Sequence, residues 1–94
     1  MGEIKHLHND TKGAFVYKVD KKRLGEMTYV MAGDHKMIIE HTGVDASLKG
    51  QGVGKKLLET LVNYTREKDI KVVPLCPFAN AMFKKVTEWQ DVLA

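Results

Sequence analysis

The sequence predicts an α+β domain in which antiparallel hairpins lead into a βαβ unit with splayed parallel strands. As far as residue 42, short segments rich in β-branched and aromatic residues alternate with polar turns of three or four residues, a pattern typical of hairpins. From residue 53 to residue 68, apolar residues recur at helical spacing. A short apolar run follows this helix, so the strands on either side of the helix are expected to be parallel.

The first half of the chain predicts three strands and a weaker fourth. Residues 14–19, 23–31 and 36–42 are each rich in Val, Ile, Thr or aromatic residues. Residues 4–8 are a weaker candidate for an additional N-terminal strand. Because the connections are short, neighbouring strands are expected to pair as antiparallel hairpins.

The second half of the chain predicts two helices around one strand. Residues 53–68 form the best-defined helix, since their apolar side chains fall at the spacing i, i+4, i+8. Residues 71–75 are short and apolar, as expected of a buried strand. A second helix is expected over residues 77–85, with Pro77 in its first turn, and a short helical turn over residues 87–93.

Length and composition limit the classes of function. The 94 residues predict one domain, residues 1–94. A single cysteine, the lack of a signal-peptide pattern and the lack of a long apolar run favour a cytoplasmic protein without membrane contact. The net charge is +3, but lysines are scattered among acidic residues, which argues against a nucleic-acid partner. His6 and His8 have no third ligand nearby, so we predict no metal site.

The most informative segment is the glycine-rich loop before the long helix, residues 48–56. Successive glycines let the backbone turn sharply and approach a ligand closely. Unpaired N–H groups at the start of a helix favour a phosphate. A Walker loop is excluded because Lys56 stands where Ser or Thr is required, and the dinucleotide fingerprint fails because Lys55 occupies the place of its third glycine.

Residues 49–54, Lys-Gly-Gln-Gly-Val-Gly, resemble the acetyl-CoA loop of the GNAT N-acetyltransferase superfamily. That loop has Gln or Arg, two residues, Gly, one residue, and then Gly or Ala. Lys49 stands where Gln or Arg is usual, and Val44 stands where the family often has an aliphatic residue at the end of a strand. The resemblance implies that main-chain N–H groups from Gln51 to Lys55 bind the pyrophosphate of acetyl-CoA or coenzyme A.

A second segment supports this resemblance. The family commonly has Asn-x-x-Ala-x-x-x-Tyr on a helix beside the cofactor, and residues 76–83 match its spacing with Ala79 retained, Cys76 in place of Asn and Phe83 in place of Tyr. The resemblance covers about half of the chain and implies a minimal GNAT-like fold, without the two helices that usually build the acceptor site. The implied cofactor-binding residues are Val44, Lys49, Gly50, Gln51, Gly52, Val53, Gly54, Lys55, Asn80 and Phe83.

Three residues are candidates for the chemistry of acetyl transfer, which needs a neutral amine, a polarised carbonyl and a proton for the leaving thiolate. Glu40 matches the place where the family often has a base. His41 is of a residue type that transfers protons near neutral pH, but neighbours on a strand face opposite ways, so both can face one cleft only if a bulge intervenes. Each also has a structural alternative, as a surface carboxylate and as a packed histidine.

Cys76 ends the second parallel strand, where the family places the sulfur of coenzyme A. Pro74 cannot donate to a strand ladder, so pairing is expected to break there and help the strands to splay. The Cys76 thiol is a candidate to accept the acetyl group or to protonate the departing thiolate. As an alternative, buried cysteines are usually inert.

Taken together, the sequence predicts an acetyl-CoA-dependent N-acetyltransferase acting on an unidentified amine. An acceptor site without covering helices favours a large acceptor, such as a protein or peptide. A first alternative is a non-catalytic module that binds coenzyme A, because Phe83 replaces the family Tyr. A second alternative, suggested by basicity alone, is a small nucleic-acid-binding domain.

Overall fold

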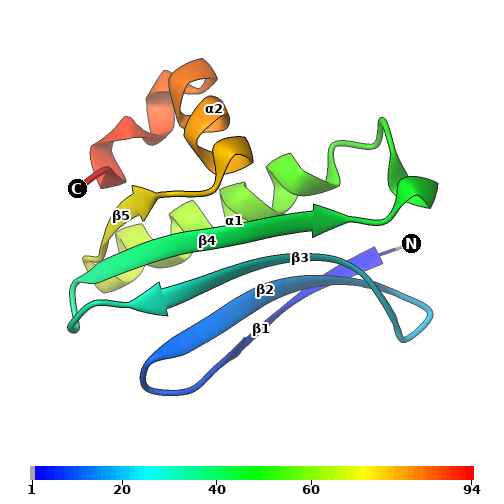
Figure 1. Ribbon diagram of the computed structural model, residues 1–94, viewed down its shortest axis with the longest axis horizontal. Helices are drawn as coiled ribbons and strands as arrows, with labels where there is room; N and C mark the ends of the chain where they lie inside the picture. The colour runs from blue at the N-terminus through cyan, green and yellow to red at the C-terminus, as the bar shows by residue number, and fades with distance from the viewer. Residues whose placement is uncertain (1) are drawn as a thin grey trace.

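The computed structural model describes residues 2–94, which form one mixed sheet with two α-helices and two 3-10 turns (Figure 1). The sheet has the order β1-β2-β3-β4-β5. Strands β1 to β4 are antiparallel neighbours and β5 is parallel to β4. The elements in chain order are β1 (Gly2–His8), β2 (Lys12–Val19), β3 (Lys22–Met31), β4 (Lys36–Val44), η1 (Ala46–Leu48), α1 (Val53–Lys68), β5 (Lys71–Pro74), α2 (Pro77–Lys85) and η2 (Thr87–Val92).

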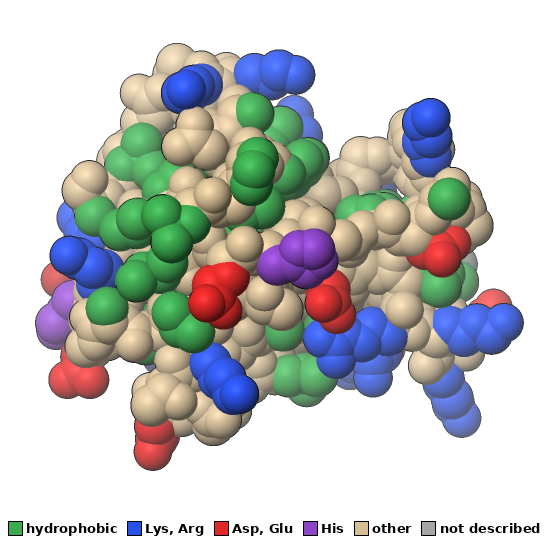
Figure 2. Space-filling model, viewed as in Figure 1, with side chains coloured by type: hydrophobic (Ala, Val, Ile, Leu, Met, Phe, Trp, Pro, Cys, Tyr) green, Lys and Arg blue, Asp and Glu red, His purple; other side chains and the backbone are tan. Residues whose placement is uncertain are grey.

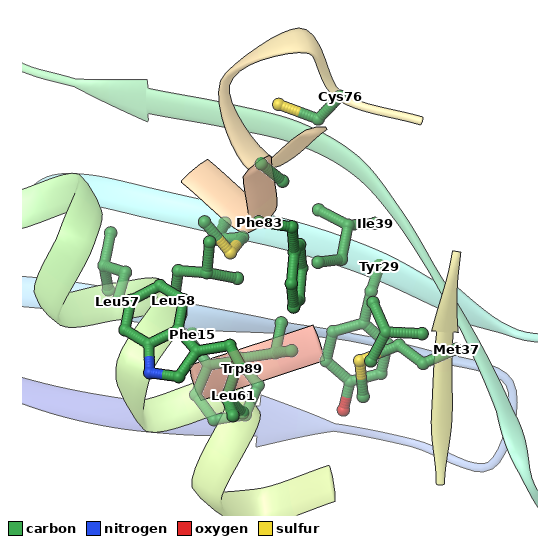
Figure 3. Close-up of a cluster of buried hydrophobic side chains, with 14 of the residues drawn as sticks. Phe15, Tyr29, Met37, Ile39, Leu57, Leu58, Leu61, Cys76, Phe83 and Trp89 are labelled. Atoms are coloured by element: carbon green, nitrogen blue, oxygen red, sulfur yellow. The ribbon is translucent and has the colours of Figure 1, made fainter. Parts of the chain in front are cut away.

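Helix α1 lies along one face of the sheet and carries the main core (Figure 1). Leu57, Leu58, Leu61 and Val62 are fully buried on this helix, as their spacing predicts. They meet the inward-facing side chains of the strands and the ring of Phe83 from α2 (Figure 3). Each fully buried aliphatic side chain contributes about 1.5–3 kcal/mol, so this one helix face supplies much of the stability of a small domain.

The two parallel strands part after a short paired stretch, as the sequence predicts. Pairing runs from Lys36 and Lys71 to Ile39 and Pro74. The N–H groups of the two residues after Pro74 both donate to the carbonyl oxygen of Ile39, each at 3.1 Å, and β5 ends there. Strand β4 continues to Val44, so a gap opens between it and the chain leading into α2. The predicted α+β class with splayed parallel strands is confirmed.

Both weaker expectations for the chain ends are confirmed and extended. The N-terminal strand is longer than residues 4–8 and pairs with β2 from Gly2 to His8. Its pattern is hard to recognise because a histidine, His6, occupies an inward position among aromatic rings. At the other end, residues 87–92 form the 3-10 turn η2, and Leu93 pairs with Val72 of β5. The C-terminus thus covers the outer edge of β5.

His6 lies in an aromatic cluster at the junction of β1, β2 and the end of α1. Its ring stacks on Phe15 with centroids 4.1 Å apart and on His8 at 4.4 Å, and Tyr64 meets it edge-on at 4.5 Å. The Tyr29 hydroxyl lies 2.5 Å from His6 Nε2 and can donate to the neutral ring. Burial, and then the charge of His8, lower the pKa of His6 to about 4.

We expect this cluster to make the protein less stable in mild acid. The unfolded chain binds a proton at His6 near the ordinary pKa of 6.5, whereas the folded chain does so only near 4, so the free energy of unfolding falls as the pH drops between these values. Because His6 is only partly buried, we expect a loss of about 1–2 kcal/mol. Urea unfolding at pH 7 and pH 4.5 measures it.

The variant His6→Phe keeps the ring stacking but cannot take up a proton, so its stability should change less over the same pH range. His35→Gln is the matched control, because His35 is exposed and makes its ring contact with the main chain of Asp69. An equal pH dependence in the wild type and His6→Phe would contradict the assignment to His6.

Candidate functional site

A cavity of about 560 Å³ lies between the end of β4, the glycine-rich loop, the first turn of α1 and α2. The surface is visibly hollowed between α2 and the loop after β4 (Figure 2). The cavity is lined by Thr42, Val44, Asp45, Ala46, Leu48, Lys49, Gly50, Gly52, Val53, Gly54, Lys55, Phe78 and Met82. It thus lies at the carboxyl end of β4, where ligands bind in sheets with parallel strands.

The three glycines of the loop serve different physical needs. Gly50 and Gly52 have φ angles of 83° and 70°, in the left-handed region that other residues adopt at a cost. A Cβ added to either would meet nothing within 4 Å. At Gly54, which lies in the helix, an added Cβ would stand 2.6 Å from Cζ of Phe78. The backbone therefore requires two of these glycines, and a neighbouring ring requires the third.

The first turn of α1 presents unpaired N–H groups to the cavity. The first helical bond runs from Lys56 N–H to the Gly52 carbonyl at 3.0 Å. Within residues 2–94, the N–H groups of residues 52–55 have no hydrogen-bond acceptor, whereas Gln51 N–H already donates to the Leu48 carbonyl at 3.1 Å. The main-chain donors open to an anion therefore begin one residue later than the resemblance implies.

Charged side chains at the cavity also favour an anion. Lys49 and Lys55 line it. The one carboxylate in the lining, Asp45, accepts hydrogen bonds from the N–H of Ser47 at 2.9 Å and from its hydroxyl at 2.5 Å. These two bonds lower the pKa of Asp45 and hold its charge at the turn that begins η1. The cavity thus combines two lysines with a helix N-terminus.

Three of the predicted cofactor-binding residues, Gln51, Asn80 and Phe83, are absent from the cavity lining. Phe83 is 2% exposed and packs in the core, with its ring 6.3 Å from that of Trp89. The Asn80 amide makes a long bond of 3.5 Å to the Pro74 carbonyl. Phe78 and Met82 line the cavity instead. Their i, i+4 spacing on α2 was the sequence signal that could have found them.

A β-bulge in β4 brings Glu40 and His41 to the same face. Ile39 pairs with Tyr29 and His41 pairs with Thr28, so Glu40 is the extra residue. Thr28 faces away from α1, and His41, its partner, faces with it. Glu40 lines a hollow on that face together with Thr28. On the face of the sheet that no helix crosses, Figure 2 shows a histidine between two acidic side chains.

Cys76 lies on the other side of β4, at the start of α2. It is 4% exposed and belongs to the same buried cluster as Phe83 (Figure 3). Cys76 Sγ lies 3.3 Å from Thr42 Oγ1. Burial alone raises the pKa of this thiol, but the hydrogen bond between the thiol and the Thr42 hydroxyl, and those from the N–H groups of Ala79 and Phe78, bring the pKa below its ordinary value.

The arrangement therefore brings a thiol with a lowered pKa close to a cavity whose lining favours an anion. Thr42 belongs to both, since it lines the cavity and contacts Cys76. His41 faces the opposite side of the sheet, and the gap between β4 and the chain after Pro74 lies between the two sides. Within residues 2–94, no group of three His, Cys, Asp or Glu side chains is placed to hold a metal, and no helix is long and apolar enough to cross a membrane.

Comparison with known proteins identifies the family. Residues 14–92 match the family of GCN5-related N-acetyl-transferases. A GCN5-like protein from Staphylococcus aureus, solved by NMR, is 38% identical, with a TM-score of 0.76 over 98% of this chain and 87% of that chain. No protein of curated function matches the sequence.

Longer acetyltransferases share the fold at lower identity. A ribosomal-protein-alanine N-acetyltransferase from Brucella melitensis biovar Abortus is 18% identical, with a TM-score of 0.70 over 83% of this chain and 62% of that chain. A GNAT family acetyltransferase from Elizabethkingia anophelis, with acetyl-CoA bound, is 15% identical, with a TM-score of 0.63 over 84% of this chain and 53% of that chain. This chain thus spans about half to two thirds of their length. It belongs to the family of GCN5-related N-acetyltransferases.

Proposed function

We propose that this protein binds acetyl-CoA in the cavity and transfers the acetyl group to a primary amine. The observation that carries the proposal is the set of unpaired N–H groups of residues 52–55, which face a cavity that also contains Lys49 and Lys55. Such a combination suits the diphosphate of coenzyme A. Acetyl-CoA bound to a relative of the same fold supports the choice of ligand.

From this diphosphate site, the pantetheine arm has an apolar route along the end of β4. The route passes Val44 and Thr42, which both line the cavity. It leads to the gap where β4 and β5 part, next to Cys76. The thioester is then placed between the Cys76 side of β4 and the open face that carries His41.

We propose that Cys76 takes the acetyl group first. Its thiolate attacks the thioester carbonyl, a Cys76 thioester forms, and the carbon–sulfur bond to coenzyme A breaks, so that coenzyme A leaves as a thiolate. The acceptor amine then attacks the new thioester, forms the amide and releases the Cys76 thiolate. The lowered pKa of Cys76 supports this role, because it raises the fraction of thiolate near neutral pH.

On the open face, His41 is the proposed base that removes a proton from the acceptor amine. A Cβ added to Gly43 would stand 3.2 Å from His41 Nε2, so the His41 ring leans along the open face toward the end of β4. Glu40 lines a hollow shared with Leu7 and Ala14, toward β1 and β2. We therefore assign proton removal to His41 and attraction of a cationic acceptor to Glu40. The uncovered face suits a protein or peptide acceptor.

The second candidate is a module that binds coenzyme A without catalysis. Phe83, which replaces the tyrosine of the family pattern, has no hydroxyl and is buried in the core, so it cannot protonate a leaving group. This alternative has the same diphosphate site but no use for the Cys76 thiol. The two candidates therefore differ in the chemistry at Cys76 and agree in the binding of coenzyme A.

An NMR titration with coenzyme A, followed by a transfer assay, tests the proposal. We expect the amide signals of residues 52–55 to move on addition of coenzyme A, since these groups would bind the diphosphate. Radiolabelled acetyl-CoA with lysine-containing peptides should then give an acetylated product. Binding without any transfer would favour the non-catalytic module. Unchanged amide signals would reject both candidates.

A further inference from the structure

Phe78 is a large apolar side chain that is partly exposed, and a packing role does not explain this exposure. It lies in the first turn of α2 and is 38% exposed, in contrast to Phe83 on the same helix at 2%. Val44, at 39% exposed, lines the same cavity. Single exposed apolar residues are normal, but two of them facing one cavity mark a surface that an apolar ligand can cover.

Gly54 holds the ring of Phe78 against the first turn of α1. An added Cβ at Gly54 would stand 2.6 Å from Cζ of Phe78 and 3.0–3.2 Å from both Cε atoms. The backbone at Gly54 is helical, and glycine is a less favourable helix residue than alanine. The chain therefore carries a less favourable helix residue at the place where it lets the ring approach.

This contact puts an aromatic ring beside the unpaired N–H groups. Gly54 itself offers one of these groups, and the Phe78 ring occupies the space where a Cβ of this residue would stand. An anion bound at this turn therefore brings the neighbouring part of its molecule against Phe78. In coenzyme A, the apolar neighbour of the diphosphate is the branched pantoyl part of the pantetheine arm.

We infer that Phe78, positioned by Gly54, binds the pantetheine arm and makes the site selective for coenzyme A over nucleotides that offer the diphosphate alone. The inference rests on the proposed function, and it adds a residue that determines which phosphate ligand is bound. Main-chain N–H groups bind any diphosphate, so selectivity requires a contact with the rest of the ligand. The apolar face of Phe78 provides it.

The test compares coenzyme A with 3′-phospho-ADP, which has the same nucleotide diphosphate but no pantetheine arm, by calorimetric titration. Phe78→Ala should weaken the binding of coenzyme A about tenfold, the equivalent of about 1.4 kcal/mol of lost apolar contact, and leave 3′-phospho-ADP unchanged. Phe78→Leu should recover part of the loss. Leu75→Ala is the matched control, because Leu75 is 67% exposed and does not line the cavity.

A double-mutant cycle separates the positioning role of Gly54 from the contact itself. Gly54→Ala should displace the ring and weaken coenzyme A, whereas Gly54→Ala combined with Phe78→Ala should be no weaker than Phe78→Ala alone. Equal losses for coenzyme A and 3′-phospho-ADP, or additive effects in the double variant, would overturn the inference. The amide shifts of the wild type test the proposed function separately, since they do not depend on Phe78.

Discussion

Replacing Gly52 by alanine is expected to weaken the binding of coenzyme A about 100-fold. This loss corresponds to one or two charge-assisted hydrogen bonds between the main chain and the ligand. The variant should still fold. The added Cβ meets nothing within 4 Å in the protein itself, so it points into open space. Gly52 lines the cavity and carries the first unpaired N–H group, so that space is where the diphosphate would lie. Calorimetric titration with coenzyme A measures the loss.

Gly33→Ala is the matched control for this prediction. Gly33 has a φ angle of 87° in the turn between β3 and β4, and an added Cβ there also meets nothing within 4 Å. Alanine in either position should cost about 1–2 kcal/mol of backbone strain. Both variants should therefore lose similar stability, but only Gly52→Ala should lose affinity. Parallel losses of affinity in the two variants would show that stability, not the loop, is responsible.

Replacing Cys76 by alanine is expected to reduce acetyl transfer at least about 100-fold and to leave the affinity for coenzyme A nearly unchanged, because the thiol acts on the reacting bond rather than on the diphosphate. Intact-protein mass spectrometry after incubation with acetyl-CoA should show one acetyl group on the wild type and none on Cys76→Ala. A full transfer rate without the thiol would reject any catalytic role for Cys76.

Thr42→Val tests the origin of the thiol reactivity. The Thr42 hydroxyl can donate to a Cys76 thiolate, and this bond helps to lower the pKa of the thiol. Valine has a similar shape but cannot donate, so the pKa should rise. The fraction of thiolate at neutral pH then falls, and the pH profile of transfer should move to higher pH. An unshifted profile would mean that ionisation of Cys76 does not limit the rate.

Local patterns were sufficient to predict most elements of this fold. The helical spacing in α1 gives its boundaries, because burial of one face against a sheet fixes the period of its apolar residues. Pro74 likewise predicts where β5 stops pairing, since a missing N–H is a property of the residue itself. The boundaries of β1 were less certain, because His6 is accommodated by Tyr29 and Phe15, which lie far away in the sequence.

The sequence by itself determined where the glycine-rich turn before α1 and the cysteine after Pro74 stand, because both depend on short segments of chain. Only the tertiary structure decided which faces meet. The bulge that turns Glu40 and His41 to one side arises from pairing with β3. The packing of α2 decides that Phe78 lines the cavity while Phe83 is buried in the core. Such choices are set by contacts between distant residues, and a local pattern does not contain them.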